Sequence, residues 1–317
     1  MTKRKSEEEP MVPRPPHRAG TVAIVGRPNV GKSTLLNALL EEDLAIVSPT
    51  PQTTRHALLG ILHLDNAQIG LLDTPGWHKP QTPLGKRLNS AARGAVEDAD
   101  VIVFVTEPSQ GVNMGVHPGD AALLANLGKD KPTILALNKI DTVRPRSKML
   151  PFLQVIGRHR DFVSVVPIAA RRNDGLDRLL KEIVELLPER EPQWGEDDLT
   201  DRPMRFFAAE FVREQILLAT REEVPHQAAV SIDLYEEKKT LTRIVATIHV
   251  ERDGQKAILL GKGGAQVKAI GTAARERLEA FLDGRKVLLE LFVRVTPDWS
   301  TSKSMLEELG FQNEGKS

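Results

Sequence analysis

Apolar runs alternate with helical patterns between about residues 21 and 188. Short apolar runs predict buried strands, and the longer segments between them, in which apolar residues recur every three or four positions, predict helices. The predicted strands are 22–25, 58–64, 67–72, 101–106, 133–138 and 163–168, and the predicted helices include 82–96 and 147–158. This alternation is typical of an α/β domain with a doubly wound, mostly parallel sheet.

A different order of elements begins at residue 204. The pattern predicts a helix over 204–221, strands over 228–236 and 241–251, helices over 255–260 and 265–282, and a strand over 286–295. The loop Gly261-Lys262-Gly263-Gly264 separates the second and third of these helices. A glycine loop of this kind within the order α-β-β-α-α-β indicates an α+β type II KH fold.

The segment 188–198 separates the two patterns because prolines and charged residues replace the apolar periodicity there. We therefore expect a disordered tail over 1–19, an α/β domain over 20–188, a linker over 189–203, and a second domain with a C-terminal helix over 204–317. The tail mixes basic, acidic and proline residues and lacks the apolar core of a signal sequence.

Composition narrows the function classes without selecting one. The 317 residues are 40% hydrophobic and 27% charged, with a formal net charge of zero, so a nucleic acid or a membrane must be contacted by a local patch. The chain has no cysteine, which excludes disulfides, thiol catalysis and thiolate metal sites and is compatible with a reducing compartment. No uncharged apolar run approaches the roughly 18 residues that span a bilayer.

The segment Gly26-Arg27-Pro28-Asn29-Val30-Gly31-Lys32-Ser33 lies between a predicted strand and a predicted helix. A strand, a glycine loop and a helix in this order predict a phosphate-binding P-loop, with an ordinary strand-to-helix turn as the alternative. We expect Lys32 to contact the β and γ phosphates and the Ser33 hydroxyl to bind Mg²⁺. The predicted nucleotide-binding residues here are Gly26, Asn29, Val30, Gly31, Lys32, Ser33 and Thr34.

Two further motifs follow predicted strands. In Asp73-Thr74-Pro75-Gly76, Asp73 can hold Mg²⁺ through water and the Gly76 N–H can sense a γ-phosphate, although the motif alone could be a turn. In Asn138-Lys139-Ile140-Asp141, the Asp141 carboxylate can accept hydrogen bonds from guanine N1–H and the 2-amino group. Adenine offers neither donor, so this motif favours guanine and disfavours an ATP-dependent kinase or helicase. Alone, it could be an N-cap or a surface turn.

These motifs, in this order and spacing, resemble those of the translation-factor-related GTPases, and Gln52-Thr53-Thr54-Arg55-His56 resembles switch I of the Era family. The resemblance implies that a threonine hydroxyl closes on Mg²⁺ when GTP is bound, and by analogy we assign Thr54 rather than Thr53. It also implies a last guanine motif at Ala169-Ala170, where Ala169 replaces the usual serine and the Ala170 N–H can still meet guanine O6. The implied catalytic residues are Lys32, Thr54 and Gly76, the metal ligands are Ser33, Thr54 and Asp73, and the base-binding residues are Asn138, Lys139, Asp141, Ala169 and Ala170.

Trp77 stands where a Ras-like hydrolase carries the glutamine that orients water. The sequence therefore resembles the GTPases with a hydrophobic residue at this position, whose relatives often bind K⁺ through an asparagine placed as Asn29 is. Two simpler interpretations remain: Asn29 as a turn-forming residue, and Trp77 as a residue that packs on its own domain.

The Gly261-Lys262-Gly263-Gly264 loop predicts contact with single-stranded RNA, because glycines let a nucleic-acid backbone approach closely. A helix C-cap or a flexible turn is the alternative. With Ala269-Ile270-Gly271 after it, the loop resembles that of the Era KH domain. Aromatics are only 4% of the chain, so we expect an apolar groove and base edges rather than stacking to recognise the bases. The predicted RNA-binding residues are Gly261, Lys262, Gly263, Gly264, Lys268 and Arg275, and we expect Arg277 to add positive charge around the loop.

The resemblance to the Era family extends from about Gly20 to Phe311. It implies a slow GTPase that binds GTP, GDP and Mg²⁺, with K⁺ as a further candidate, and that binds ribosomal RNA near the 3′ end of the small-subunit RNA. It further implies assistance in assembling a 30S-type particle, and a cytoplasmic location with peripheral association with the inner membrane; we expect a monomer. A passive RNA-binding assembly scaffold with a structural nucleotide site is the alternative, which the intact Lys32, Ser33, Asp73 and Asp141 disfavour.

Overall fold

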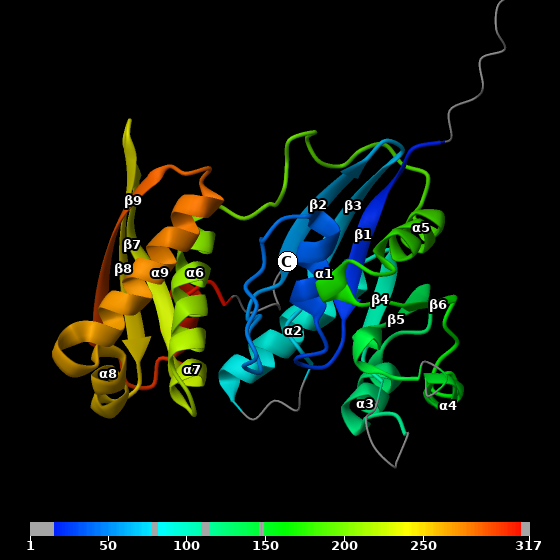
Figure 1. The fold of residues 1–317 in the computed structure, drawn as a ribbon, viewed down its shortest axis with the longest axis horizontal. Coiled ribbons are helices and arrows are strands. Elements are labelled where there is room, and N and C mark those ends of the chain that lie inside the picture. The colour runs from blue at the N-terminus through cyan, green and yellow to red at the C-terminus, as the bar shows by residue number, and fades with distance from the viewer. Residues whose placement is uncertain (1–15, 78–81, 109–114, 146, 148, 312–317) are drawn as a thin grey trace, which may run out of the picture.

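The chain folds into two α/β-containing domains that pack side by side (Figure 1). The computed structural model describes residues 16–77, 82–108, 115–145, 147 and 149–311. Residues 1–15 of the predicted tail therefore lie outside the described residues. At its end the tail prediction is wrong, because Arg18 and Ala19 already belong to the first strand and pair with Ala67 and Gln68. Across the described part of the chain, none of the helices combines the length and the apolar character needed to cross a bilayer.

A six-stranded sheet forms the centre of the first domain, with the strand order β2-β3-β1-β4-β5-β6. All neighbouring strands are parallel except β2, which is antiparallel to β3. The strands are β1 (Arg18–Val25), β2 (Leu58–Leu64), β3 (Ala67–Asp73), β4 (Val101–Thr106), β5 (Thr133–Leu137) and β6 (Ser164–Pro167). The helices are α1 (Lys32–Leu40), α2 (Pro83–Asp98), α3 (Pro118–Asn126), α4 (Met149–Ile156) and α5 (Leu176–Leu186).

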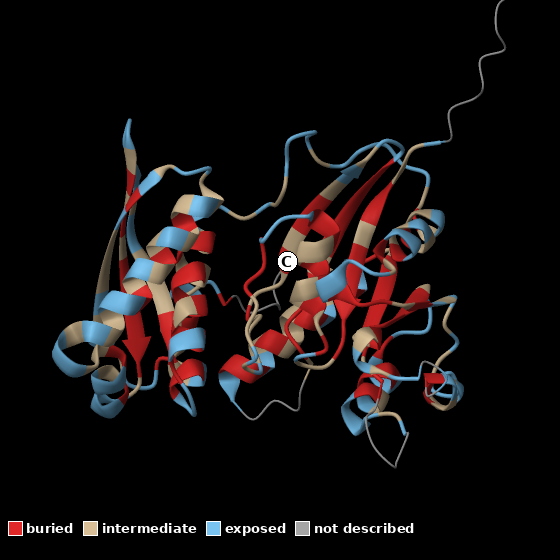
Figure 2. Ribbon diagram, in the orientation of Figure 1, coloured by how far each residue is buried: buried red, intermediate tan, exposed pale blue. Residues whose placement is uncertain are grey.

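Both faces of this sheet are buried because its strands alternate between two cores. On β1, Val22 and Ile24 belong to one core, whereas Ala23 and Val25 belong to the other. Helices α1 and α5 cover the first face, and α2, α3 and α4 cover the second. Figure 2 shows the strands of this domain mostly in the colour of buried residues. Strands buried on both faces read as continuous apolar runs, which explains the sequence pattern.

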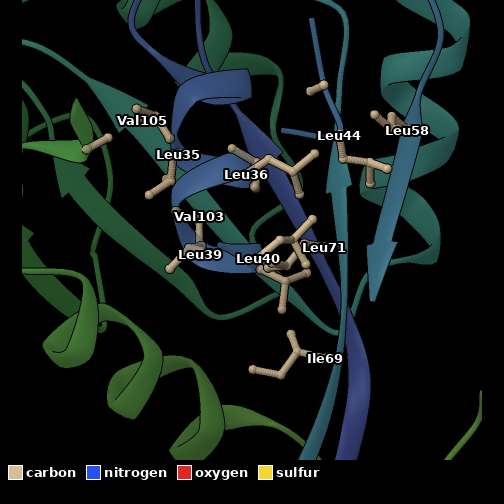
Figure 3. Close-up of a cluster of buried hydrophobic side chains, with 14 of the residues drawn as sticks. Leu35, Leu36, Leu39, Leu40, Leu44, Leu58, Ile69, Leu71, Val103 and Val105 are labelled. Carbon is tan, nitrogen blue, oxygen red and sulfur yellow. The ribbon is translucent and has the colours of Figure 1, made fainter. Parts of the chain in front are cut away.

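Helix α1 fixes the P-loop to the sheet through four leucines. Leu35, Leu36, Leu39 and Leu40 point from α1 onto the strands (Figure 3), where they meet Ile69 and Leu71 of β3 and Val103 and Val105 of β4. All four leucines are at least 93% buried. Burial of each such side chain contributes about 1.5–3 kcal/mol, so the start of α1 is held firmly at the carboxyl ends of the strands.

The second domain has the predicted KH order with one additional short helix. Its sheet has the order β7-β8-β9, with β7 antiparallel and β9 parallel to β8. Helices α6 and α9 pack on this sheet. The elements are α6 (Met204–Ala219), α7 (Val224–Gln227), β7 (Ala229–Glu237), β8 (Leu241–Val250), α8 (Asp253–Leu260), α9 (Ala265–Phe281), β9 (Lys286–Val295) and α10 (Lys303–Glu308).

The expected fold class is confirmed, and some element ends differ. The strand predicted over 163–168 is only Ser164–Pro167, and that predicted over 133–138 ends at Leu137. Helix α7 was not predicted, because one turn containing a proline has too few residues to show a helical period.

The predicted linker packs against the first domain. Ile61 N of β2 donates to Leu199 O at 2.8 Å, and the Gln68 side chain of β3 donates to Trp194 O at 2.8 Å. The Trp194 ring also occupies the space that a side chain at Gly70 would need. The segment between the domains is therefore anchored along β2 and β3.

Candidate functional site

The P-loop depends on two residues with left-handed backbone. Gly31, which caps α1, has a φ of 100°, and Asn29 has a φ of 64°. A Cβ atom at Gly31 would overlap the side-chain amide of Asn138, which donates to Val30 O at 2.8 Å. This arrangement ties the loop to the end of β5 and leaves the first N–H groups of α1 free to bind an anion.

Three oxygen-bearing side chains converge beside the P-loop. Ser33 Oγ lies 2.6 Å from Asp73 Oδ2 and 2.8 Å from Thr54 Oγ1, which lies 3.2 Å from the same carboxylate oxygen. Two hydroxyls and a carboxylate form the kind of oxygen donor set that Mg²⁺ prefers. Thr53 has different partners, since its hydroxyl bonds to Ser48 and to Thr50 O. The geometry therefore supports Thr54 over Thr53 as the switch threonine.

Two buried charges beside these hydroxyls need a ligand. Asp73 is fully buried, and its Oδ1 atom has no hydrogen-bond partner among the described residues. Burial raises the pKa of the Asp73 carboxyl and lowers the pKa of the Lys32 ammonium, each opposed by the charge of the other group. A cation near Asp73 and an anion near Lys32 would offset these desolvation costs. The side chains present are therefore compatible with a metal ion beside Asp73 and a phosphate beside Lys32.

The predicted base-binding residues meet around Asn138. Its Oδ1 atom accepts hydrogen bonds from Lys139 N at 2.8 Å and from Ala170 N at 3.1 Å, so this side chain joins the ends of β5 and β6. The Asp141 carboxylate is 3.1 Å from Arg172 Nε, a side chain that is 66% exposed. Such an exposed ion pair contributes little free energy, so a guanine can take its place at the carboxylate.

One cavity of about 390 Å³ is lined both by the predicted phosphate-binding residues and by the predicted base-binding residues. Most of the predicted nucleotide-binding residues line it, namely Asn29, Gly31, Lys32, Ser33, Thr34, Thr54, Gly76, Asn138, Lys139, Asp141 and Ala170. The others, Gly26, Val30, Asp73 and Ala169, lie behind this wall. Gly26 packs on Val105 O, and Val30, Asp73 and Ala169 are buried. They therefore shape the cavity instead of lining it.

Sequence reasoning missed part of the cavity wall. The additional lining residues are Pro28, Ile46, Val47, Ser48, Pro49, Gln52, Thr53, Thr142 and Arg171. Most come from the segment 46–56, which we call the switch I segment because it contains the predicted switch I motif. Its approach to the P-loop is a tertiary contact, for example the 3.0 Å hydrogen bond from the Asn29 side chain to Pro49 O. Gln52 and Thr53 belong to the switch I motif itself, and for Ile46, Val47, Ser48 and Pro49 the available signal was their position shortly before that motif.

Gly76 and Trp77 are placed differently although they are neighbours. Gly76 lies against Pro28 of the P-loop and lines the cavity. Trp77 packs against the core formed with α2, α3 and α4, and the Arg93 guanidinium lies 5.3 Å from its ring centroid. Trp77 is not one of the described residues that line the cavity. The interpretation that Trp77 packs on its own domain is the one this structure shows.

The switch I segment is also held by the second domain. Arg55, which is 3% exposed, donates to Ala228 O at 2.7 Å, His226 O at 2.8 Å and Pro225 O at 3.2 Å. The Glu214 carboxylate of α6 accepts from Val47 N at 3.2 Å. Burial lowers the pKa of Arg55 to about 9, with the nearby Arg213 charge acting in the same direction.

The segment 299–311 forms a second bridge between the domains. Trp299, Leu306 and Phe311 share a buried cluster with Leu84 and Leu88 of α2. The Phe311 ring also stacks on His56 of the switch I segment, with centroids 4.3 Å apart. Helix α2 and the switch I segment thus contact the same C-terminal segment.

The glycine loop of the second domain is exposed, and no side chain from a distant segment packs on Gly263 or Gly264 among the described residues. Gly261, Gly263 and Gly264 have φ values of 67°, 62° and 81°. Lys262 and Lys268 are exposed and Arg275 is half-buried. A Cβ at Gly263 or Gly264 would meet no atom within 4 Å among the described residues. Such open backbone beside positive charge suits a phosphate backbone.

The expectation for Arg277 is wrong. Its guanidinium lies over the Phe211 ring at 4.6 Å, donates to Asp43 O at 2.6 Å and lies 3.6 Å from Glu214. Helix α9 turns this side chain toward the first domain. Its charge is therefore paired at the domain interface and does not add to the positive charge around the glycine loop. The helical period separates it from Lys268 and Arg275, a distinction that a count of nearby basic residues does not make.

Two family models match the chain. A model described as a 50S ribosome-binding GTPase matches residues 21–139, and a KH domain model matches residues 223–300. GTPase Era of Stenotrophomonas maltophilia is 45% identical over 300 residues, which cover 94% of this chain and 98% of that protein. GTPase Era of Xylella fastidiosa is 44% identical over 301 residues, with the same coverage of 94% and 98%.

Two solved structures match over both domains. One is a variant of Aquifex aeolicus Era bound to GDP and aluminium fluoride, with a TM-score of 0.88. The other is Era in complex with MgGDPNP and nucleotides 1506–1542 of 16S ribosomal RNA, with a TM-score of 0.89. Each is 41% identical and covers 93% of this chain and 99% of the matched chain.

Proposed function

Because this chain belongs to the Era family of GTPases, we propose that it hydrolyses GTP as a switch that governs binding to small-subunit ribosomal RNA and assists assembly of the small ribosomal subunit. The observation that carries the switch is the convergence of Ser33, Thr54 and Asp73 within 3.2 Å, since it joins the P-loop, the switch I segment and β3 at one point. A bound γ-phosphate and Mg²⁺ would hold this junction closed, and hydrolysis would release it.

Individual roles follow from the positions of the side chains. Lys32 and the N–H groups of α1 would bind the β and γ phosphates, and Mg²⁺, when bound by Ser33, Thr54 and Asp73, would neutralise their charge. Gly76, which faces the P-loop, would offer its N–H to the γ-phosphate. The remaining predicted residues would form the loop and the base site, namely Gly26, Asn29, Val30, Gly31, Thr34, Asn138, Lys139, Asp141, Ala169 and Ala170.

Hydrolysis needs positive charge at the phosphates, and K⁺ is our candidate for it. Trp77 packs on its own domain, so it does not orient water. Asn29 lines the cavity between the P-loop and the switch I segment, and its side chain reaches Pro49 O. A monovalent cation beside Asn29 would act on the developing charge as an arginine finger does.

The RNA assignment rests on the exposed loop and on a relative. The solved relative that contains 16S ribosomal RNA shares both domains with this chain. We propose that Gly261, Lys262, Gly263, Gly264, Lys268 and Arg275 contact a single-stranded backbone here. The exposed side chain of Ile258 on α8 offers apolar surface beside this loop.

We further propose a first domain that begins with β1 at Arg18 rather than at residue 20 and extends to about 188, and a second domain over 204–317. We also propose 189–203 as an anchored linker, a cytoplasmic monomer, and peripheral association with the inner membrane. The ends of α5 and α6 support the limits, since α5 ends at Leu186 and α6 begins at Met204.

Multiple-turnover GTP hydrolysis, measured with and without small-subunit RNA, tests the proposal. A switch should hydrolyse GTP slowly and bind the RNA more tightly with a GTP analogue than with GDP. If the RNA affinity is the same with both nucleotides and without any, the chain is a passive scaffold with a structural nucleotide site. Removal of Mg²⁺ should abolish turnover, because the Asp73 carboxylate would then lack its cation.

A further inference from the structure

Alternating charges extend from Lys139, in the wall of the nucleotide cavity, to Glu107, Arg27 and Asp120, three described residues that do not line it. Glu107 directly follows β4, and its Oε1 atom accepts from Arg27 Nη2 at 2.8 Å. Its Oε2 atom lies 2.5 Å from Lys139 Nζ. Arg27 belongs to the P-loop and Lys139 to the base motif, so one carboxylate joins the two halves of the site. We propose that Glu107 is a positioning residue for guanine nucleotide binding.

Each partner of Glu107 is fixed by a further contact. Lys139 Nζ also donates to Asn29 O of the P-loop at 2.7 Å. With its ammonium held between these two oxygens, the aliphatic stem of Lys139 is left to line the cavity where a base would lie. Glu107 therefore restrains a side chain that itself would contact the nucleotide.

Arg27 extends the restraint to the phosphate side. Its Nε atom lies 3.2 Å from the Asp120 carboxylate, which is 1% exposed and accepts from Thr106 Oγ1 at 2.8 Å. The Arg27 carbonyl in turn accepts from Lys32 Nζ at 3.2 Å. The side chain of Arg27 is thus anchored between two carboxylates, and its backbone faces the phosphate-binding lysine.

Burial makes this network more than a set of surface ion pairs. The side chains of Arg27 and Glu107 are 19% and 26% exposed. Burial alone would raise the pKa of the Glu107 carboxyl, yet its pKa is lowered because Lys139 and Arg27 stabilise the charged form. Side chains that share partners in this way lose less freedom for each added contact than isolated pairs do. The inference rests on the proposed guanine nucleotide function and extends it to a residue behind the cavity.

Release of a fluorescent GDP analogue from the full-length chain tests the inference. Glu107→Gln keeps the shape of the side chain and removes its charge, so both cations lose their shared partner. We expect release to be about tenfold faster, the lower end of the range for hydrogen bonds to charged groups. In GTP hydrolysis, KM should rise while kcat at saturation stays near the parent value. Glu185→Gln, on the exposed surface of α5, is the matched control and should release GDP at the parent rate.

Two measurements separate positioning from a structural role. The melting temperature of nucleotide-free Glu107→Gln should match the parent, whereas the increase on adding GDP should be smaller. In a Lys139→Met background, Glu107→Gln should add much less than it does alone, because the side chain it positions is gone.

Release within twofold of the parent, or an equal loss of melting temperature with and without GDP, would overturn the inference. A parent chain that binds no guanine nucleotide would overturn the proposed function, and the inference with it.

Discussion

Two glycine loops that each lead into a helix place their glycines in very different surroundings. In the P-loop, Gly31 packs against Asn138 from another strand, and the loop is tied to β5, β3 and the switch I segment. In the second domain, Gly263 and Gly264 face open space, and the nearby charges come from the same loop and from α9. The first site is built by distant residues and the second by local backbone and charge. Substitutions should therefore affect folding and binding together in the first loop and mainly binding in the second.

The largest expected difference is between alanine substitutions of the two glycines. Gly31→Ala must accept a φ of 100° and displace Asn138, whose amide makes three hydrogen bonds, so we expect about 3–4 kcal/mol less free energy of unfolding. Gly263→Ala meets no atom and should cost only about 1 kcal/mol, the strain of a left-handed residue. Denaturant unfolding of both variants measures this, and equal losses would remove the contrast.

The base site offers the next test. Asp141→Asn removes the acceptor for two guanine donors, so the affinity for GTP should fall by about 2–3 kcal/mol. Xanthine nucleotides should bind better than in the parent, because their 2-oxo group accepts the hydrogen bond that the asparagine amide donates. Calorimetric titration with both nucleotides measures the exchange. A variant with parent affinity for GTP would show that the base lies elsewhere.

Charge reversal at the exposed loop should separate the two sites. Lys262→Asp combined with Gly263→Asp places two negative charges where a phosphate backbone would approach, and RNA affinity should fall at least about tenfold at moderate salt. GTP affinity should stay at the parent value, since no residue of this loop is among the described residues that line the cavity. Binding of full-length protein to small-subunit 3′ RNA and to an unrelated strand of equal length is the measurement. Arg277→Ala is the control, because that side chain faces the first domain. Unchanged RNA affinity in the double variant would place the RNA elsewhere.

The smallest effect concerns the cation. Exchange of K⁺ for Na⁺ should slow GTP turnover about tenfold without changing nucleotide affinity, because the cation would act on charge that develops during hydrolysis. Asn29→Ala should turn over slowly in both salts. Equal rates in K⁺ and Na⁺ for the parent would exclude a K⁺ site at Asn29.

The same contrast explains what the sequence could predict. The glycine loops, Ser33, Asp73 and the Asn138–Asp141 motif are recognisable because each occupies one end of a strongly patterned strand or helix. The contacts of Glu107, Arg55 and Arg277 have no local signal, because each joins segments that are far apart along the chain. The separation of the domains at residues 188–198 was read from composition, whereas the packing between them depends on side chains such as His56 and Phe311.

The stacking of Phe311 on His56 has a consequence for the order in which the molecule is made. During translation the first domain emerges from the ribosome before residues 299–311 are synthesised, and domains commonly fold in that order. The switch I segment must therefore wait for its partners, from α6 through to Phe311, while the P-loop, β3 and β5 are already present. A nascent chain can thus bind its nucleotide before the second domain contacts the switch I segment. The contacts of that segment are complete only when Phe311 has been synthesised and packs on His56.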